Sequence, residues 1–155
     1  MDKRRMLEKL LSKSEFASIE YSNALNDDNS LLSLMATNNV YRRYDWKDLV
    51  TENDFFAFVS ERAIKLTNQF LKPDTMSATA LFRVMKKNIQ EGDWLPFLFG
   101  HYDKLIQQNN LGIVFLDKGD DSYSVFVVQR ENISKLQRIK SDMWVFKRVK
   151  KNLHL

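Results

Sequence analysis

The chain contains no cysteine, which excludes a disulfide framework, a cysteine-ligated zinc site and a thiol nucleophile. It has only two histidines, His101 and His154, and neither has a second histidine at the spacing of metal ligands. His154 is the penultimate residue, where chain ends fray. A catalytic His101 would need convergent partner groups, and the sequence pattern supplies none. We therefore expect a non-enzymatic protein in which His101 is a structural or surface residue.

Glycine is also scarce, because the chain has four glycines and two prolines. The glycines are too widely spaced for a phosphate-binding loop, so both common nucleotide-binding fingerprints are absent. The acidic segment Asp117–Asp121 has neither the alternating oxygen ligands nor the closing glutamate of a calcium loop, and it is typical of a hairpin turn. We expect no cofactor and no metal.

Long apolar runs are missing as well. The basic start MDKRRMLEKLL is interrupted by charged residues, and no later segment is long enough for a membrane span. The sequence thus predicts a cytoplasmic protein. With 155 residues and 44% hydrophobic residues, one core is sufficient, so we expect residues 1–155 to form a single domain.

The N-terminal two-thirds has the spacing of amphipathic helices. Asp2 can cap a first helix that reaches about Leu11, and the clearest helix begins at residues 51–54 and stops before Pro73. The expected buried stripe of that helix is Phe55, Val59, Arg62, Ala63, Leu66 and Phe70. Residues 40–50 are ambiguous, and Asp45 could cap a single helical turn there.

Two further helices are expected before residue 111. Thr75 can cap the first of them, and residues 94–110 form the second, with Pro96 tolerated in its first turn. The expected buried stripe of the first is Met76, Ala80, Leu81, Val84, Met85 and Ile89. In the second, Leu98, Tyr102, Leu105 and Ile106 are expected to face inward.

The hydrophobic period then changes to that of strands. Residues 111–116 are apolar on both faces, and residues 123–129 form a second strand after the acidic turn, which predicts an antiparallel hairpin. A short helix over 131–140 and an edge strand over 143–149 follow. The expected fold is α+β, with the helical N-terminal two-thirds packed on one face of a small, mainly antiparallel C-terminal β-β-α-β sheet.

The net charge of +4 is unevenly distributed. Residues 130–155 carry a net charge of +6, and the rest of the chain carries −2. Basic residues beside Trp144 and Phe146 suit phosphate contacts with base stacking, although the core also needs these two rings. This basic C-terminal edge is the candidate for an alternative function, nucleic-acid binding, through Arg138, Lys140, Lys147, Arg148, Lys150 and Lys151.

The layout resembles bacterial toxin-immunity proteins of the contact-dependent inhibition type. The features that carry the resemblance are the helical segments TENDFFAFVSERAIKLTNQF and TMSATALFRVMKKNIQ, the hairpin LGIVFLDKGDDSYSVFVV and the closing strand MWVFKRV. The resemblance implies a small cytoplasmic α+β protein that binds one cognate toxin domain and blocks its active site. Immunity proteins against basic nuclease toxins are usually acidic, whereas this chain is basic.

If the resemblance holds, acidic surface residues are the expected contacts with a partner protein, because complementary charge speeds association and sharpens specificity. The candidate partner-binding residues are Asp27, Asp28, Glu91, Asp93, Asp117, Asp120 and Asp121.

Overall fold

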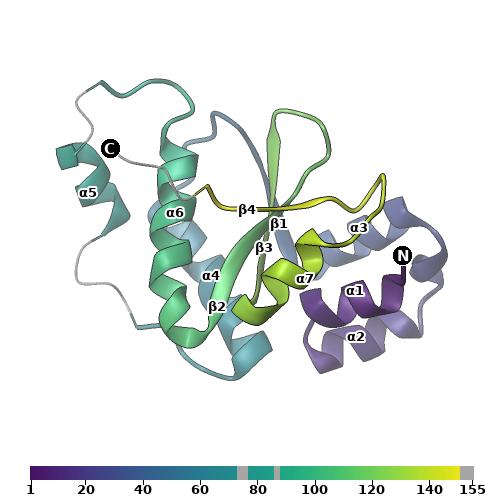
Figure 1. The fold of residues 1–155 in the computed structure, drawn as a ribbon. Coiled ribbons are helices and arrows are strands. Elements are labelled where there is room, and N and C mark those ends of the chain that lie inside the picture. Colours follow the sequence, from purple (N-terminus) through teal and green to yellow (C-terminus); the bar gives the residue numbers. More distant parts are fainter. Residues whose placement is uncertain (73–76, 86–87, 151–155) are drawn as a thin grey trace.

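The computed structural model describes residues 1–72, 77–85 and 88–150. A four-stranded antiparallel sheet lies at its centre, with strand order β1-β3-β2-β4 (Figure 1). The strands are β1 (Tyr41–Asp45), β2 (Leu111–Leu116), β3 (Ser122–Gln129) and β4 (Phe146–Arg148). The α+β class, the hairpin and the edge position of the last strand are confirmed.

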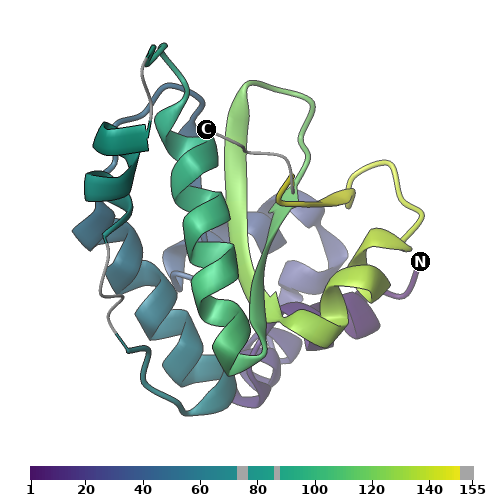
Figure 2. The same cartoon turned by 60° about the vertical axis from the view of Figure 1, so that its left-hand side comes forward.

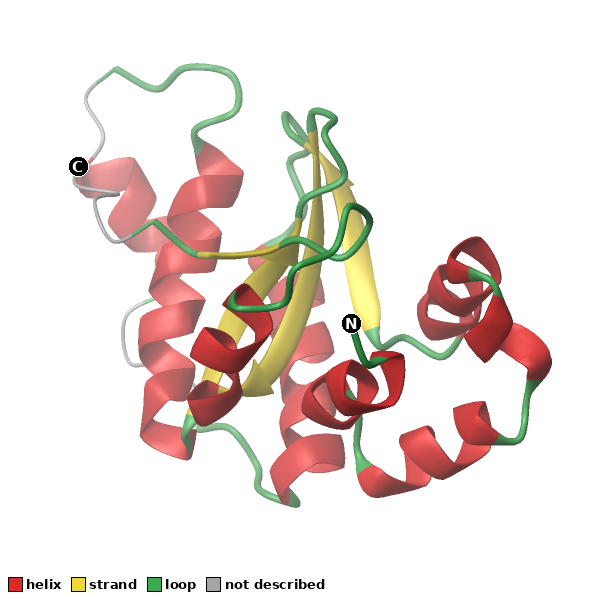
Figure 3. Cartoon of the chain, turned by 45° about the vertical axis from the view of Figure 1, so that its right-hand side comes forward, coloured by secondary structure: helices red, strands yellow, loops and turns green. Residues whose placement is uncertain are grey.

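Helices cover both faces of this sheet, as Figures 2 and 3 show from two sides. One face carries α1 (Lys3–Leu10), α2 (Lys13–Glu20), α3 (Asp28–Thr37) and α7 (Ile133–Gln137). The other carries α4 (Glu52–Thr67), α5 (Ala78–Met85) and α6 (Trp94–Ile106). The described residues also form three 3-10 segments, η1 (Asn23–Asn26), η2 (Gln107–Asn109) and η3 (Arg130–Asn132).

The expectation that the helices pack on one face is therefore wrong. The reason lies in the two central strands, which are apolar on both sides. Val114 and Phe126 belong to the core beneath α1 and α3, whereas Ile113 and Val125 belong to the core beneath α4 and α6. Each face thus needs its own helical cover. The helices α1–α3 and α7 cover one face, and α4–α6 cover the other.

The ambiguous segment 40–50 contributes β1, an edge strand, rather than a capped helical turn. Tyr41 pairs with Phe126 of β3, and their rings stack with centroids 4.9 Å apart. The next two residues, Arg42 and Arg43, are exposed, which protects an edge strand from pairing with other chains. The sheet therefore has one N-terminal strand that the expected β-β-α-β order lacked.

Two helix details also differ from expectation. α4 ends at Thr67 because Asn68 takes a left-handed conformation, so Phe70 lies beyond the helix and is 81% exposed. α5 buries Ala78 and Phe82, whereas Val84, expected inside, is 83% exposed. Met85 and Ile89 are also exposed, and Thr75 and Met76 lie outside the described residues. The inward positions Leu98, Tyr102 and Ile106 of α6 are confirmed.

Candidate partner-binding surface

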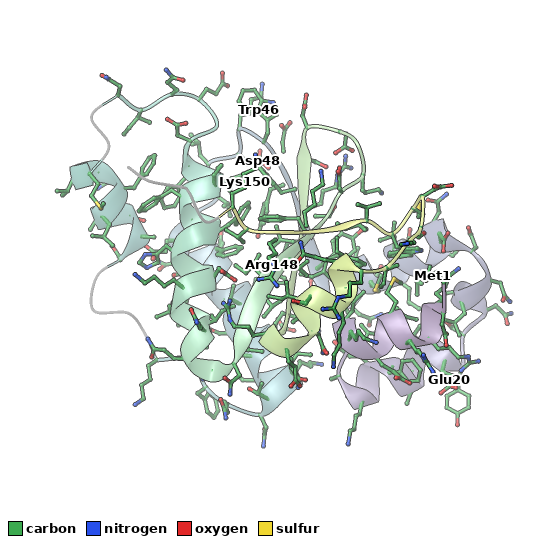
Figure 4. The ribbon with its side chains drawn as sticks, in the orientation of Figure 1. Met1, Glu20, Trp46, Asp48, Arg148 and Lys150 are labelled. Atoms are coloured by element: carbon green, nitrogen blue, oxygen red, sulfur yellow. The ribbon has the colours of Figure 1, made fainter. Side chains whose placement is uncertain are left out.

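Trp46 connects three loops at one end of the molecule. Its backbone N–H donates to the carbonyl of Asp121 over 3.0 Å, which ties the loop after β1 to the β2–β3 turn. Its indole ring lies against Gly92, where an added Cβ would come within 2.5 Å of two ring carbons. Residues 45–51, 88–93 and 117–122 therefore meet at this end, where Figure 4 labels Trp46 and Asp48. We call these three loops the acidic end.

The acidic end holds seven carboxylates and two lysines, a net charge of −5 on a chain whose total is +4. The carboxylates belong to Asp45, Asp48, Glu91, Asp93, Asp117, Asp120 and Asp121, and the lysines are Lys47 and Lys118. Five of these seven are the acidic residues expected from the sequence, so the structure brings most of that set together. Asp45 and Asp48 join them through the fold.

Two cations border the acidic end and neutralise part of it. Lys147 Nζ lies 2.7 Å from Asp117 Oδ2, and the Arg43 guanidinium lies 3.2 Å from Asp120 Oδ2. The Lys147 ammonium and the Gly119 amide lower the pKa of Asp117. The pKa of Asp120 is lowered chiefly by hydrogen bonds from the Ser122 hydroxyl and amide. These carboxylates stay ionised at neutral pH, and Asp121 and Glu91 add exposed charge beside them.

An apolar groove adjoins these charges. The groove encloses about 550 Å³ between residues 47–52, α5 and residues 89–94. Leu49 is 82% exposed and Ile89 is 56% exposed along the groove, and Trp46 beside it is 38% exposed. Isolated exposed apolar residues are ordinary, but several around one groove are typical of a binding surface. Sequence reasoning missed this cluster, because Ile89 was assigned to a buried stripe and Trp46 to an ambiguous segment.

Glu52, the first residue of α4, fixes the wall of this groove. Its carboxylate accepts hydrogen bonds from the Ala78 and Thr79 amides, at 2.9 and 3.0 Å, and from the Tyr102 hydroxyl, at 3.0 Å. The carboxylate therefore satisfies the free amides at the start of α5. Burial raises the pKa of Glu52, but these hydrogen bonds outweigh it and the net shift is downward.

Trp94 closes the groove from the side of α6. Its indole N–H donates to the carbonyl of Val50 over 2.8 Å, and its ring packs edge-on against Phe82 of α5 at a centroid distance of 5.3 Å. The loop after β1, α5 and α6 are thus held together by specific contacts. The exposed side chains of the groove project from a fixed framework, which lowers the entropy cost of binding.

Asp27 and Asp28 do not join the acidic end. Asp27 caps α3 by accepting the Asn29 amide, which is a structural role at a helix N-terminus. Asp28 accepts the Trp144 indole N–H over 3.1 Å and pairs with Lys3 at 2.6 Å. Both carboxylates stabilise the helical layer of α1 and α3, and the structure gives them local partners there.

The basic C-terminal edge is built from α7 and β4, and its cations lie on both faces of the sheet, because Lys147 lies on the face of Phe115 and Arg148 on the face of α7. Arg148 donates to the side chains of Gln137 and Ser134, so β4 is tied to α7 (Figure 4). Arg138 and Lys140 are exposed beside it. Lys147 and Lys150 lie on or just after β4, and Lys151 lies outside the described residues. Trp144 and Phe146 are buried, as the core reading of these rings predicts.

His101 lies half-buried on α6, between the rings of Phe97 and Tyr102 at centroid distances of 6.3 and 5.5 Å. Within residues 1–72, 77–85 and 88–150, no three histidine, aspartate or glutamate side chains converge as metal ligands would. None of the helices in these ranges is both long and apolar enough to cross a membrane.

Comparison with known proteins gives one match. The sequence profile of a family described as a domain of unknown function (DUF6630) matches residues 4–145, which run from the first turn of α1 to beyond the end of α7. No curated protein and no solved structure matches the chain.

Proposed function

The chain belongs to the DUF6630 family, and we propose that it is a non-enzymatic protein-binding module whose acidic end docks onto a basic surface of a partner protein. The observation that carries the proposal is the combination of a net charge of −5 with exposed Trp46, Leu49 and Ile89 around one groove. Protein interfaces characteristically combine an apolar centre with a polar rim.

The two components of the surface have different tasks. Leu49 and Ile89 supply apolar area that becomes buried on binding, and Trp46 is the type of residue that most often dominates binding energy. The surrounding carboxylates attract a basic partner over longer distances and raise its association rate. Since Gly92 and Asp121 hold Trp46 in place, the surface is largely preformed.

The partner that we propose first is a toxin domain with a basic active-site surface, as the resemblance to immunity proteins implies. The positive charge of the whole chain does not oppose this, because screening limits surface charges to a range of about 8–10 Å at physiological salt. The partner would therefore experience the local charge of the acidic end. An apolar side chain of the partner would enter the groove, while the carboxylates of the acidic end pair with the partner's cations.

A second candidate function is nucleic-acid binding by the basic edge. The contacts of Arg148 with Gln137 and Ser134 bring α7 and β4 together, so Arg138 and Lys140 lie on the same side of the sheet as Arg148. This candidate predicts affinity for DNA or RNA that falls steeply with salt. It differs from the partner-binding proposal in both ligand and surface.

Site-specific photo-cross-linking tests the partner-binding proposal. A benzophenone amino acid at Leu49 is compared in the native host with the same group at Tyr21, an exposed residue after α2. We expect position 49, and not position 21, to cross-link to one protein, which then binds the purified chain. Identical products at both positions, or binding only to nucleic acid, would reject the acidic end as the docking surface.

A further inference from the structure

A separate pocket lies between the first turn of α6, the β2–β3 hairpin and β4. It encloses about 320 Å³, within the range of small-molecule sites. Its apolar wall includes Pro96, Phe115, Tyr123 and Val149. This pocket shares Asp117 and Ser122 with the acidic end but none of the exposed apolar residues of the groove.

Aromatic rings form the most regular part of the wall. The centroids of Phe115 and Tyr123 are 5.6 Å apart, and both lie 5.2 Å from the ring of Phe99 beneath them. Phe99 is fully buried, whereas the other two are half-buried. The core therefore holds two partly accessible rings in place, and such rings are suitable for stacking against a planar ligand.

Cations surround the same pocket. Lys147, Arg148 and Lys150 line it together with a single carboxylate, Asp117. The Arg148 guanidinium donates to Gln137 and Ser134 of α7, so the two lysines are the cations available to a ligand in the pocket. Lys147 alternates with Phe146 along β4, so it lies on the sheet face of Phe115, its pairing partner in β2. Exposed Lys150 follows two residues after the strand ends. A ligand on the rings would therefore place an attached anionic group beside two lysines.

We propose that this pocket binds a nucleoside monophosphate, with the base against Phe115 and Tyr123 and the phosphate beside Lys147 and Lys150. A phosphate monoester carries about −1.5 to −2 charges at pH 7, which the two lysines can balance. A neutral aromatic ligand makes no use of the two lysines, and inorganic phosphate leaves the rings uncovered. The bound phosphate would share Lys147 with Asp117, which lies 2.7 Å from the ammonium. The proposal does not rest on partner binding at the acidic end, although the two sites share Asp117 and Ser122.

Isothermal titration calorimetry of the full chain tests this site with three probes at low salt. The probes are AMP, adenosine and ribose 5-phosphate, which separate the contributions of the base and the phosphate. We expect AMP to bind at least about tenfold more tightly than either fragment, since both halves of the pocket contribute. No binding of AMP, or equal binding of AMP and ribose 5-phosphate, would overturn the proposal.

Paired lysine variants locate the site without disturbing the core. Lys147→Gln/Lys150→Gln removes two charges at the pocket, and Lys135→Gln/Lys140→Gln removes two exposed charges of the basic segment 130–155 outside it. We expect the first pair to weaken AMP binding about tenfold and the second to change it less than about twofold. Equal losses would reject the pocket in favour of general attraction to the basic segment. Binding of an oligonucleotide but not AMP would also reject it.

Discussion

Arg62 of α4 and Glu15 of α2 form a buried, two-pronged ion pair that joins helices from opposite faces of the sheet. Nη1 of Arg62 lies 2.6 Å from one Glu15 oxygen, and Nη2 lies 3.1 Å from the other. The Arg62 side chain is 1% exposed. Glu15 also accepts the Ser12 amide in a capping box, so its position is fixed from both sides. This pair connects the two helical layers through residues that are 47 positions apart in sequence.

Breaking this pair is expected to be costly. Arg62→Met leaves Glu15 charged and without its partner in a buried position, which should lower the free energy of unfolding by about 3–5 kcal/mol. The matched control is Arg4→Met, which removes the exposed Arg4–Glu20 pair and should cost less than about 1 kcal/mol. Urea denaturation followed by circular dichroism measures both. Equal, small losses would show that Arg62 does not hold the layers together.

The pH dependence of stability should also report Glu15. Burial raises its pKa, but hydrogen bonds from Arg62 and the Ser12 amide outweigh this and leave the pKa below its usual value. A depressed pKa in the folded state contributes stability above the unfolded value of about 4.3, and this is lost as pH falls through the folded value. We expect the thermal midpoint of Glu15→Gln to fall less between pH 5 and pH 3 than that of the wild type. Parallel curves would contradict this assignment.

Gly92 is expected to control the position of Trp46. Gly92→Ala places a methyl group 2.5 Å from the indole and strains a backbone with φ of 88°. Gly119→Ala has a similar φ of 73° but meets no atom within 4 Å, so it isolates the backbone strain, about 1 kcal/mol. We expect Gly92→Ala to destabilise the protein more than Gly119→Ala and to change tryptophan fluorescence. If both variants behave alike, the indole does not depend on Gly92.

Glu52 should determine whether α5 stays docked. Glu52→Gln keeps the size of the side chain but removes the charge that accepts the Ala78 and Thr79 amides. We expect faster amide exchange across α5, while α6 stays protected, because losing a helix cap costs about 1 kcal/mol. Hydrogen exchange with mass spectrometry measures this. Unchanged exchange in α5 would show that Phe82 and Ala78 alone hold the helix.

Parts of this fold could be predicted from the sequence because their hydrophobic patterns are local. β2 and β3 are continuous apolar strands around an acidic turn, and α6 has a regular buried stripe. The buried face of α5 could not be predicted, because Phe82 and Val84 are both apolar and the docking of the helix depends on Glu52, which is remote in sequence. β1 was hidden because two arginines interrupt its hydrophobic pattern.

The sequence predicted the charged residues of the candidate surface but not its exposed apolar residues, again because only local signals can be recognised. Acidic residues in turns mark exposed positions, so Glu91 and Asp121 could be proposed as contacts. The role of Trp46 could not be predicted, because it depends on contacts with Asp121 and Gly92, both more than 40 residues away in sequence. Trp46 stands next to Asp45 and two residues before Asp48, and an aromatic residue flanked by carboxylates was the available signal.

Association kinetics with the protein cross-linked at position 49 give the most direct test of the acidic end. The variant Glu91→Lys/Asp121→Lys reverses two exposed charges there, and Glu8→Lys/Glu20→Lys reverses two exposed charges on α1 and α2. We expect the first variant to lower the association rate constant by about tenfold at low salt, with little effect of the second. Equal rate constants for both variants and the wild type would contradict docking through the acidic end.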